Sequence, residues 1–328
     1  RGGGRDEGGL SAEMFSSFFR EVLKPEAGLF EPAPDAEGGG LLPRSDAPEE
    51  DMEAVGRVIV KALIDDHPLG HGLAPVALEF LCGVHEESFA TVTAALAALR
   101  HFDPTLADNW ASLLTEPAAQ AGLTVGDFPA DAHETSAVDD ETPLTADIAA
   151  SVITRACRCR LVGERRGALL ALRRGFTEAV DLQLQLAPLS RAELAFMLQG
   201  KATLSAAELL SCFVLPGASE HEAEAAGFHA EGSCAHELFH ELISDDLAFD
   251  EACRRRLFEW CTALRALPSA GLKDKIRLKL YQGVDESTLP ETHTCTHELH
   301  LPDYSSREQL ANRLLLALDH IHDGFHKD

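Results

Sequence analysis

A polar, glycine-bearing stretch, LPGASEHEAEAAGFHAEGS, interrupts the apolar periodicity of the chain after residue 214. A segment of this length without helical or strand periodicity is typical of a connection between two separately packed parts of a chain. We therefore expect a hinge at residues 217–233, with a first lobe at residues 1–216 and a second lobe at residues 234–328. The length of 328 residues also suits about two domains.

Most of the first lobe has the periodicity of amphipathic helices. Apolar residues recur at helical spacing in residues 11–23 and 52–64, and residues 145–172 indicate one or two long helices. A serine followed three residues later by Glu or Gln marks further helix starts at Ser190, Ser205 and Ser306. The first lobe is thus predicted to be large and mainly helical.

Strand signals are concentrated in the second lobe. Apolar and basic residues alternate across residues 276–280, and the segment HELHL precedes a proline at residue 302. The second lobe is therefore expected to mix helix and sheet, which makes the whole chain a two-lobed α+β protein.

Charge and cysteine usage limit the expected partners and compartment. The formal charge is −26, and no local basic patch offers a phosphate-binding surface, so nucleic acid is not an expected partner. No segment reaches the ~18 to 20 apolar residues that a membrane span needs. The eight cysteines form no CxxC pair and resemble the reduced thiols of an intracellular protein. We expect a soluble chain in the cytoplasm or nucleus.

One short stretch, LPETHTCTHELHLP at residues 289–302, contains one cysteine and three histidines. Zinc binds thiolate and imidazole, and an extended chain would place His293, Cys295 and His297 on one face, with His300 nearby. Alternatively, Cys295 is a nucleophile on a loop between regular elements. The spacing alone leaves both hypotheses open.

A second pattern, HELFH at residues 236–240, matches the HExxH signature of zinc proteases. In such proteins two histidines one helical turn apart bind zinc, and the glutamate, here Glu237, acts as a base. Glu259 is a candidate third ligand, but no recognisable third-ligand motif follows. With 15 histidines and many glutamates in the chain, this pattern is weak evidence by itself.

The stretch LPETHTCTHELHLPDYSSREQLANRLLLALDHIHDGF closely resembles the catalytic end of HECT-type ubiquitin ligases, whose pattern is LP-x-x-HTCFN-x-L-x-LP-x-YSS, a helix and a terminal GF. DEGGLSAEMFSSFFREVLKPEAGLF is similar to the opening helix of that domain, and AVGRVIVKALIDDHPL to its Gly-Arg helix. TPLTADIAASVITRACRCRL and ALRRGFTEAVDL are similar to the middle of its first lobe. The resemblance is collinear over almost the whole chain.

This resemblance implies a bilobal HECT fold and a two-step acyl transfer without metal or cofactor. Cys295 would accept ubiquitin from a conjugating enzyme as a thioester and pass it to a lysine of a protein substrate, with His293 and Thr294 as supporting loop residues. His293 either favours the thiolate or makes a structural hydrogen bond. Phe325, near the C-terminal end, would order the transfer step or simply cap the last helix.

The resemblance also places the docking subdomain for the conjugating enzyme within residues 180–212, around ELAFMLQGKATLSAAEL. Core packing competes with docking for its apolar candidates, which are Leu184, Leu186, Phe196 and Leu210. The HELFH segment would then be a packing helix with Phe239 and Leu242 in the core. The remaining histidines near Cys295 would be local hydrogen-bonding or surface groups.

The chain departs from the family pattern at three places, and the first of them motivates an alternative. Thr296 and His297 replace Phe and Asn, LFHE at residues 238–241 replaces WFWE, and residues 262–264 replace a TGS turn with Thr, Ala and Leu. The alternative is a degenerate HECT fold that binds partners without catalysis.

Overall fold

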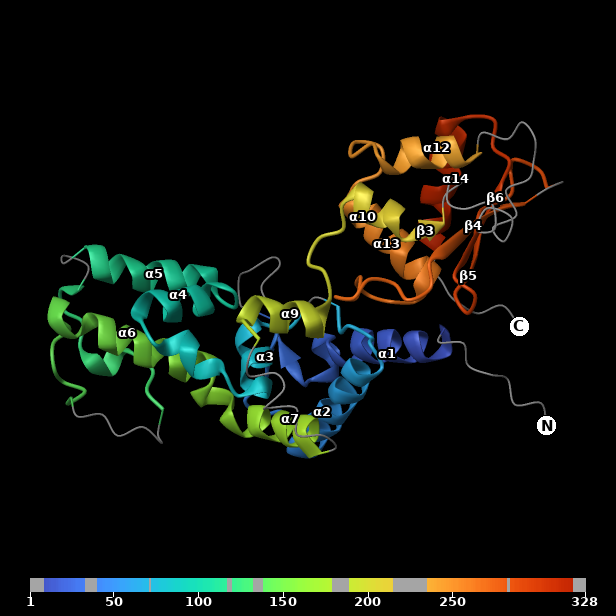
Figure 1. The fold of residues 1–328 in the computed structure, drawn as a ribbon. Coiled ribbons are helices and arrows are strands. Elements are labelled where there is room, and N and C mark those ends of the chain that lie inside the picture. The colour runs from blue at the N-terminus through green and yellow to red at the C-terminus, as the bar shows by residue number, and fades with distance from the viewer. Residues whose placement is uncertain are drawn as a thin grey trace. The chain divides into compact units, whose positions relative to one another are not determined.

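The contacts of the computed structural model divide the chain into two compact units (Figure 1). Unit 1 comprises residues 1–17, 66–70 and 199–328, and unit 2 comprises residues 18–65 and 71–198. The structure describes residues 9–32, 40–70, 72–116, 120–131, 138–178, 189–214, 235–281 and 284–320. The predicted hinge at residues 217–233 lies outside these ranges and stays a prediction. Among the described residues, no helix is long and apolar enough to cross a membrane.

Unit 2 is mainly helical, as predicted for the first lobe. A short antiparallel strand pair, β1 (Phe30–Glu31) and β2 (Leu42–Pro43), accompanies the helices. The helices are α2 (Glu49–Ile64), α3 (Pro75–Cys82), α4 (Val92–Arg100), α5 (Pro104–Thr115), α6 (Ala146–Leu161), α7 (Arg166–Glu178) and α9 (Arg191–Gln199). Residues 145–172 thus form two helices, since the turn η5 (Gly163–Arg165) separates α6 from α7.

Helices α2 and α7 pack main chain against main chain. A Cβ atom at Gly56 would lie 2.0 Å from the carbonyl oxygen of Leu172, and one at Gly175 would lie 1.9 Å from the carbonyl oxygen of Glu53. Both distances are far below van der Waals contact, so only glycine permits this approach. Gly56 belongs to the AVGRVI segment and Gly175 to the RRGF segment. Both segments resemble parts of the HECT first lobe, and in this fold both have a packing role.

In unit 1, helices pack against one face of a four-stranded sheet. Its strands follow the order β3-β4-β6-β5, in which β3 and β6 run parallel to β4 and β5 runs antiparallel to β6. The strands are β3 (Phe213–Val214), β4 (Ile276–Tyr281), β5 (Glu291–His293) and β6 (Glu298–Pro302). The helices are α1 (Gly9–Val22), which runs on into unit 2, α10 (Ala206–Ser211), α12 (Ala235–Ile243), α13 (Glu251–Thr262) and α14 (Arg307–His320).

The alternation predicted for residues 276–280 separates the two faces of this sheet. Ile276 and Leu278 of β4 are buried with Leu299 and Leu301 of β6 in the core of unit 1. The residues between them, among them Arg277, point to the opposite face because successive side chains of a strand alternate. One face of the sheet is therefore apolar and covered by helices, and the other is polar.

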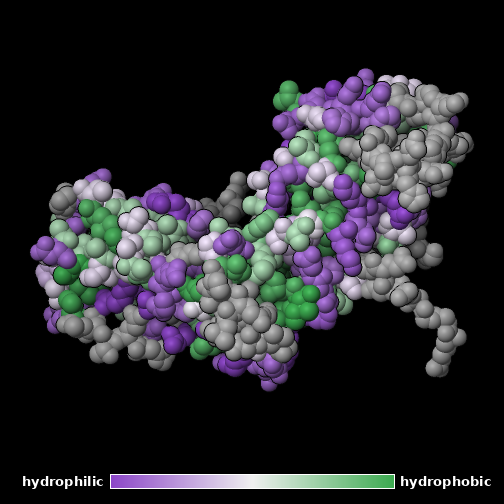
Figure 2. All heavy atoms as spheres, in the orientation of Figure 1, coloured by the Kyte–Doolittle hydropathy of each residue, from purple (hydrophilic) through white to green (hydrophobic). Residues whose placement is uncertain are grey.

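The HELFH segment lies on α12, where it was expected to be a packing helix. Phe239 and Leu242 are fully buried, and the ring of Phe239 makes an edge-on contact with that of Phe213 at 5.1 Å. His240 is exposed, and Figure 2 shows hydrophilic residues over the outer side of this helix. The predicted core residues are confirmed.

Residues 199–214 pack with unit 1, whereas the sequence assigned them to the first lobe. Leu209, Cys212 and Phe213 are buried in the core of unit 1, and β3 extends its sheet beside β4. The apolar spacing in this segment is the same whichever core receives it, so the sequence could not show which lobe it joins.

Candidate active site around Cys295

Cys295 lies at the tip of the hairpin formed by β5 and β6. The pairing of His293 with Glu298 leaves a four-residue loop at residues 294–297. The amide of Thr296 donates to the carbonyl oxygen of His293 at 3.2 Å, as in the turns from which four-residue hairpin loops are usually built. The last loop residue, His297, has a positive φ of 47°. Histidine, like asparagine, is enriched in this conformation, so His297 preserves the loop where the family pattern has Asn.

The loop is anchored from the neighbouring strand β4. The main-chain amide of Arg277 donates to the carbonyl oxygen of His297 at 2.8 Å, and its guanidinium donates to that of Thr296 at 3.0 Å. The Nδ1 atom of His297 lies 3.0 Å from the carbonyl oxygen of Asp274. These contacts fix the residues after Cys295 while the cysteine itself stays exposed.

Tyr304 of the LPDYSS segment anchors the chain before the hairpin. Its hydroxyl donates to the carbonyl oxygen of Thr288 at 2.7 Å, and its side chain is buried. Burial raises the pKa of the Tyr304 hydroxyl, which keeps it protonated as a donor. Tyr304 belongs to the LPDYSS segment that resembles HECT ligases, and in this fold it supports the hairpin.

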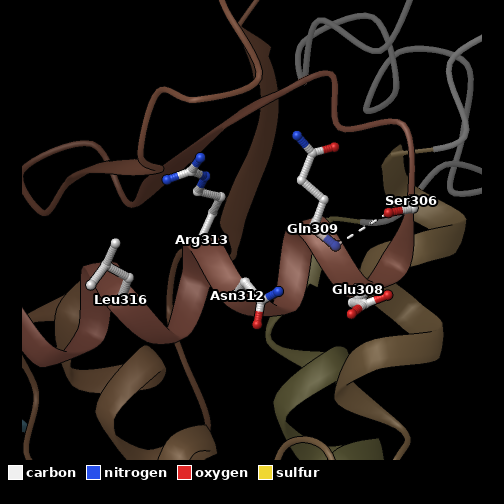
Figure 3. Close-up of a pocket in the computed structure, with 6 residues that line it drawn as sticks. All are labelled: Ser306, Glu308, Gln309, Asn312, Arg313 and Leu316. Atoms are coloured by element: carbon white, nitrogen blue, oxygen red, sulfur yellow. Dashed lines mark hydrogen bonds between the residues drawn. The ribbon is translucent and has the colours of Figure 1, made fainter.

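Helix α14 begins directly after the LPDYSS segment, and Figure 3 shows side chains on its exposed side. A shallow depression there is lined by Ser306, Glu308, Gln309, Asn312, Arg313 and Leu316. The amide of Gln309 donates to the Ser306 hydroxyl at 3.2 Å, which confirms the predicted helix start, but the Gln309 side chain bonds the Ser305 hydroxyl at 3.1 Å. By contrast, Ser190 and Ser205 form reciprocal capping boxes with the glutamates three residues later.

Exposure distinguishes Cys295 from the other described cysteines. Five of them are buried, at positions 82, 157, 159, 212 and 261, and Cys253 is half-buried. Burial raises the pKa of Cys82 to about 11 and that of Cys157 to about 12, which keeps these thiols protonated. Among the described cysteines, only Cys295 is placed to meet a reactant on another protein.

A shallow polar depression surrounds Cys295. It is lined by Thr292, His293, Thr294, Cys295, Thr296, Glu298 and His300. The rings of His293 and His300 meet edge to face, with their centroids 4.7 Å apart. The supporting residues predicted for the loop, His293 and Thr294, therefore do line the depression that contains Cys295.

Glu298 is a charged group in the lining of this depression. The Lys279 ammonium lies 2.8 Å from one carboxylate oxygen, and Nε2 of His300 lies 3.0 Å from the other. Burial alone would raise the pKa of Glu298, but the hydrogen bonds from Lys279 and His300 and the charges of Lys279 and Arg277 outweigh it and lower the pKa. His300 was predicted as a zinc ligand, a local hydrogen-bonding group or a surface group, and no role was predicted for Glu298, although alternation along HELHL places both on the polar face.

The histidines of this region are engaged in other contacts than a shared metal. In the part of the chain that the structure describes, no group of three or more His, Cys, Asp or Glu residues could hold a metal ion. His297 contacts a main-chain carbonyl, and His300 contacts Glu298. Neither the cluster at residues 293–300 nor the HELFH segment therefore has the geometry of a zinc site.

The remaining predicted site residues are only partly described. Leu184, Leu186 and Phe325 lie outside the described residues. Phe196 is half-buried on α9, and Leu210 is 7% exposed in the core of unit 1. Leu210 is therefore a packing residue in this conformation and does not present its side chain to a partner.

Comparisons with known proteins agree with this geometry. The family model of the HECT domain, described as a ubiquitin-transferase domain, matches residues 16–328. The chain belongs to the HECT-domain family. Its α+β architecture agrees with that family, so the predicted fold class is confirmed.

Three relatives illustrate the degree of similarity to other HECT proteins. The E3 ubiquitin-protein ligase HUWE1 of Mus musculus is 25% identical over 98% of this chain and 7% of its own length. The bifunctional serine/threonine-protein kinase/NEDD4-like E3 ubiquitin-protein ligase of Dictyostelium discoideum is 24% identical over 84% of this chain and 13% of its own length. The E3 ubiquitin-protein ligase UPL1 of Arabidopsis thaliana is 31% identical over 30% of this chain and 3% of its own length. The chain thus spans a small part of each relative.

The departure from the HECT pattern at the end of α13 has a local cost. Ala263 ends this helix with a positive φ of 58°, a conformation in which glycine, present in the family's TGS turn, is unstrained. The hydroxyl of Ser16 donates to the carbonyl oxygen of Ala263, and the hydroxyl of Thr262 accepts from the amide of Leu264 at 3.1 Å. These bonds hold the strained turn in place.

Proposed function

We propose that this chain is the catalytic domain of a ubiquitin ligase. It accepts ubiquitin from a conjugating enzyme as a thioester on Cys295 and transfers it to lysines of protein substrates. The supporting observation is the position of Cys295, which is exposed at the tip of an anchored hairpin and matches the cysteine of the HTC pattern. We place this activity in the cytoplasm or nucleus, because the seven cysteines that the structure describes form no disulfide.

The first step is an exchange between two thioesters. The Cys295 sulfur attacks the carbonyl carbon at the end of ubiquitin, and the bond from that carbon to the cysteine of the conjugating enzyme breaks. The thiol proton of Cys295 is transferred to the departing sulfur. Because a thioester is already activated and cysteine is highly nucleophilic, this step needs little help from a general base.

A charging assay tests the proposal directly. The chain is incubated with activating enzyme, a panel of conjugating enzymes, ATP and ubiquitin, and the products are separated with and without reducing agent. We expect an adduct that reducing agent removes, and we expect Cys295→Ala to abolish it. Cys253→Ala is the matched control, because Cys253 is a half-buried thiol in the same unit, and this variant should form the adduct normally.

The same assay separates this function from the alternative of a non-catalytic binding module. The alternative is motivated by Thr296, an exposed residue where the family pattern has Phe. A module that only binds would retain the conjugating enzyme but form no reducible adduct with any member of the panel. An adduct that persists in Cys295→Ala would contradict the proposed nucleophile.

Two parts of the proposal concern residues outside the described ranges. We propose that residues 217–233 act as the hinge that lets Cys295 face the conjugating enzyme first and the substrate later. We also propose that Phe325 orders the second step. Phe325→Ala should therefore accept ubiquitin normally but release it slowly to lysine, so the thioester accumulates. Equal losses in both steps would make Phe325 a packing residue only.

A further inference from the structure

The polar face of the unit 1 sheet continues into the loop that carries Cys295. Pairing between β4, β6 and β5 sets the order of its side chains across the strands. One row contains Arg277, Glu298 and His293, and the next contains Lys279, His300 and Glu291. Cys295 lies two residues after His293, the member of the first row on β5. Charged and imidazole groups therefore share the sheet face that leads to the loop of the proposed nucleophile.

Three neighbouring side chains hold the carboxylate of Glu298 in place. Its side chain is 11% exposed, and its carboxylate oxygens lie 2.8 Å from Nζ of Lys279, 3.5 Å from a guanidinium nitrogen of Arg277 and 3.0 Å from Nε2 of His300. Both oxygens are thus engaged by neighbouring side chains. This geometry suits a group that orients His300, and it leaves Glu298 poorly placed to receive a proton from an incoming amine.

His300, held by Glu298, in turn restricts the orientation of the His293 ring. Its side chain is 20% exposed, and its ring meets that of His293 edge to face with an interplanar angle of 69°. Such a contact restricts the orientation of both rings. His293 is exposed, and both rings line the depression that contains Cys295. His293 is therefore the imidazole that an approaching substrate meets.

We propose that Glu298 and His300 are a positioning pair that holds the imidazole of His293 beside Cys295, where His293 accepts a proton from the incoming substrate lysine. This inference rests on the proposed function, because it concerns the second step of the transfer. An amine is protonated at neutral pH and cannot attack until it loses a proton. A base held in place in the depression removes that obstacle.

The substrate lysine arrives as an ammonium ion. One proton moves to His293, and the freed nitrogen electron pair forms a bond to the thioester carbonyl carbon. The bond from that carbon to the Cys295 sulfur breaks, and its electron pair leaves with the sulfur. The nitrogen loses a second proton to this thiolate, and His293 releases its proton to solvent. The products are an amide, the free thiol and one proton.

A single-turnover experiment tests the pair. The full chain is loaded with ubiquitin, further loading is stopped, and free lysine is added as the acceptor while the thioester is followed over time. We expect His300→Ala and Glu298→Ala to load within about twofold of the unmodified chain but to discharge on the order of tenfold more slowly. Glu298→Gln keeps an oxygen that can accept from His300, so it should recover most of the discharge rate.

A double-mutant cycle shows whether the pair acts through His293. We expect His293→Ala to slow discharge at least as much as His300→Ala, and the double variant to be no slower than His293→Ala alone. The control is Glu308→Gln, which removes a charge from the exposed side of α14, outside the depression, and should leave both steps unchanged. Thermal unfolding of every variant reports any loss of the fold.

Several results would overturn the pair. Additive losses in the double variant would mean that His300 acts independently of His293. Unchanged discharge in His300→Ala, or equal losses of loading and discharge, would leave the pair with a structural role only. A chain that forms no adduct at all would overturn the proposed function itself, and the role of the pair with it.

Discussion

The β5–β6 hairpin of unit 1 and the α2–α7 helix pair of unit 2 both contain segments that resemble HECT ligases. The residues that resemble the family have different structural roles in the two regions. In the helix pair, Gly56 and Gly175 remove side chains so that two main chains can touch. In the hairpin, main-chain bonds and Tyr304 hold a loop whose cysteine stays exposed. A similar glycine is therefore explained by close packing, whereas packing does not explain a similar exposed cysteine on an anchored loop.

Alkylation of thiols gives the largest expected contrast between the exposed hairpin and the packed helices. In the folded chain Cys295 should react with iodoacetamide on the order of a thousandfold faster than Cys157 of α6, which reacts only when its helix opens. Mass spectrometry of digested samples over time measures both rates. Comparable rates would mean that α6 is far less protected than its burial implies.

Gly175→Ala should give the largest loss of stability. The added methyl group has no space beside the carbonyl oxygen of Glu53, so the helices must separate, and we expect the free energy of unfolding of unit 2 to fall by about 3 kcal/mol. Urea unfolding followed by circular dichroism measures the change.

The matched control for this substitution lies on the same helix. A Cβ atom at Gly167 would meet only a carboxylate oxygen of Glu49 at 3.5 Å, which is ordinary contact. Gly167→Ala should therefore be neutral or stabilise unit 2 by up to about 1 kcal/mol. If both substitutions have the same effect, the close approach of α2 and α7 is not what requires glycine at position 175.

Tyr304→Phe should cause an intermediate loss of stability, and this loss should be confined to unit 1, which contains the hairpin. It keeps the ring but removes the donor to the Thr288 carbonyl oxygen, so we expect unit 1 to lose about 1 kcal/mol. Ser305→Ala, which removes an exposed hydroxyl beside it, should change stability by less than about 0.5 kcal/mol. Thermal unfolding of both variants checks this order, and equal shifts would contradict the anchoring role of Tyr304.

Ala263→Gly should give the smallest effect, and with the opposite sign. Glycine adopts the positive φ at this helix end without strain, so we expect unit 1 to gain about 0.5 to 1 kcal/mol. Ala252→Gly, at an exposed position in the first turn of the same helix, should instead destabilise unit 1. A loss of stability in both variants would show that the turn at residue 263 is not strained.

The comparison also explains which features could be predicted from the sequence. Alternation across residues 276–280 predicted β4, and helical spacing predicted α2, because these patterns depend only on local geometry. The core residues Phe239 and Leu242 were predicted through the resemblance of their segment to a packing helix of HECT ligases. The assignment of residues 199–214 was different, because an amphipathic segment does not encode which core it joins. The importance of Cys295 was predicted through its loop pattern, whereas the roles inferred for Glu298 and His300 depend on pairing between β4, β5 and β6.

Unit 1 is assembled from three separate stretches of the chain, whereas all of unit 2 lies between residues 18 and 198. During synthesis from the N-terminal end, every residue of unit 2 leaves the ribosome before the sheet of unit 1 has been made. Residues 9–17 of α1 are synthesised before unit 2, yet their partners, Ala263 and the surrounding core, are synthesised after it. The helical unit can therefore fold early as a separate body, while the opening turns of α1 wait for the second half of the chain. The hairpin that carries the proposed nucleophile is consequently completed only after the whole helical unit has been synthesised.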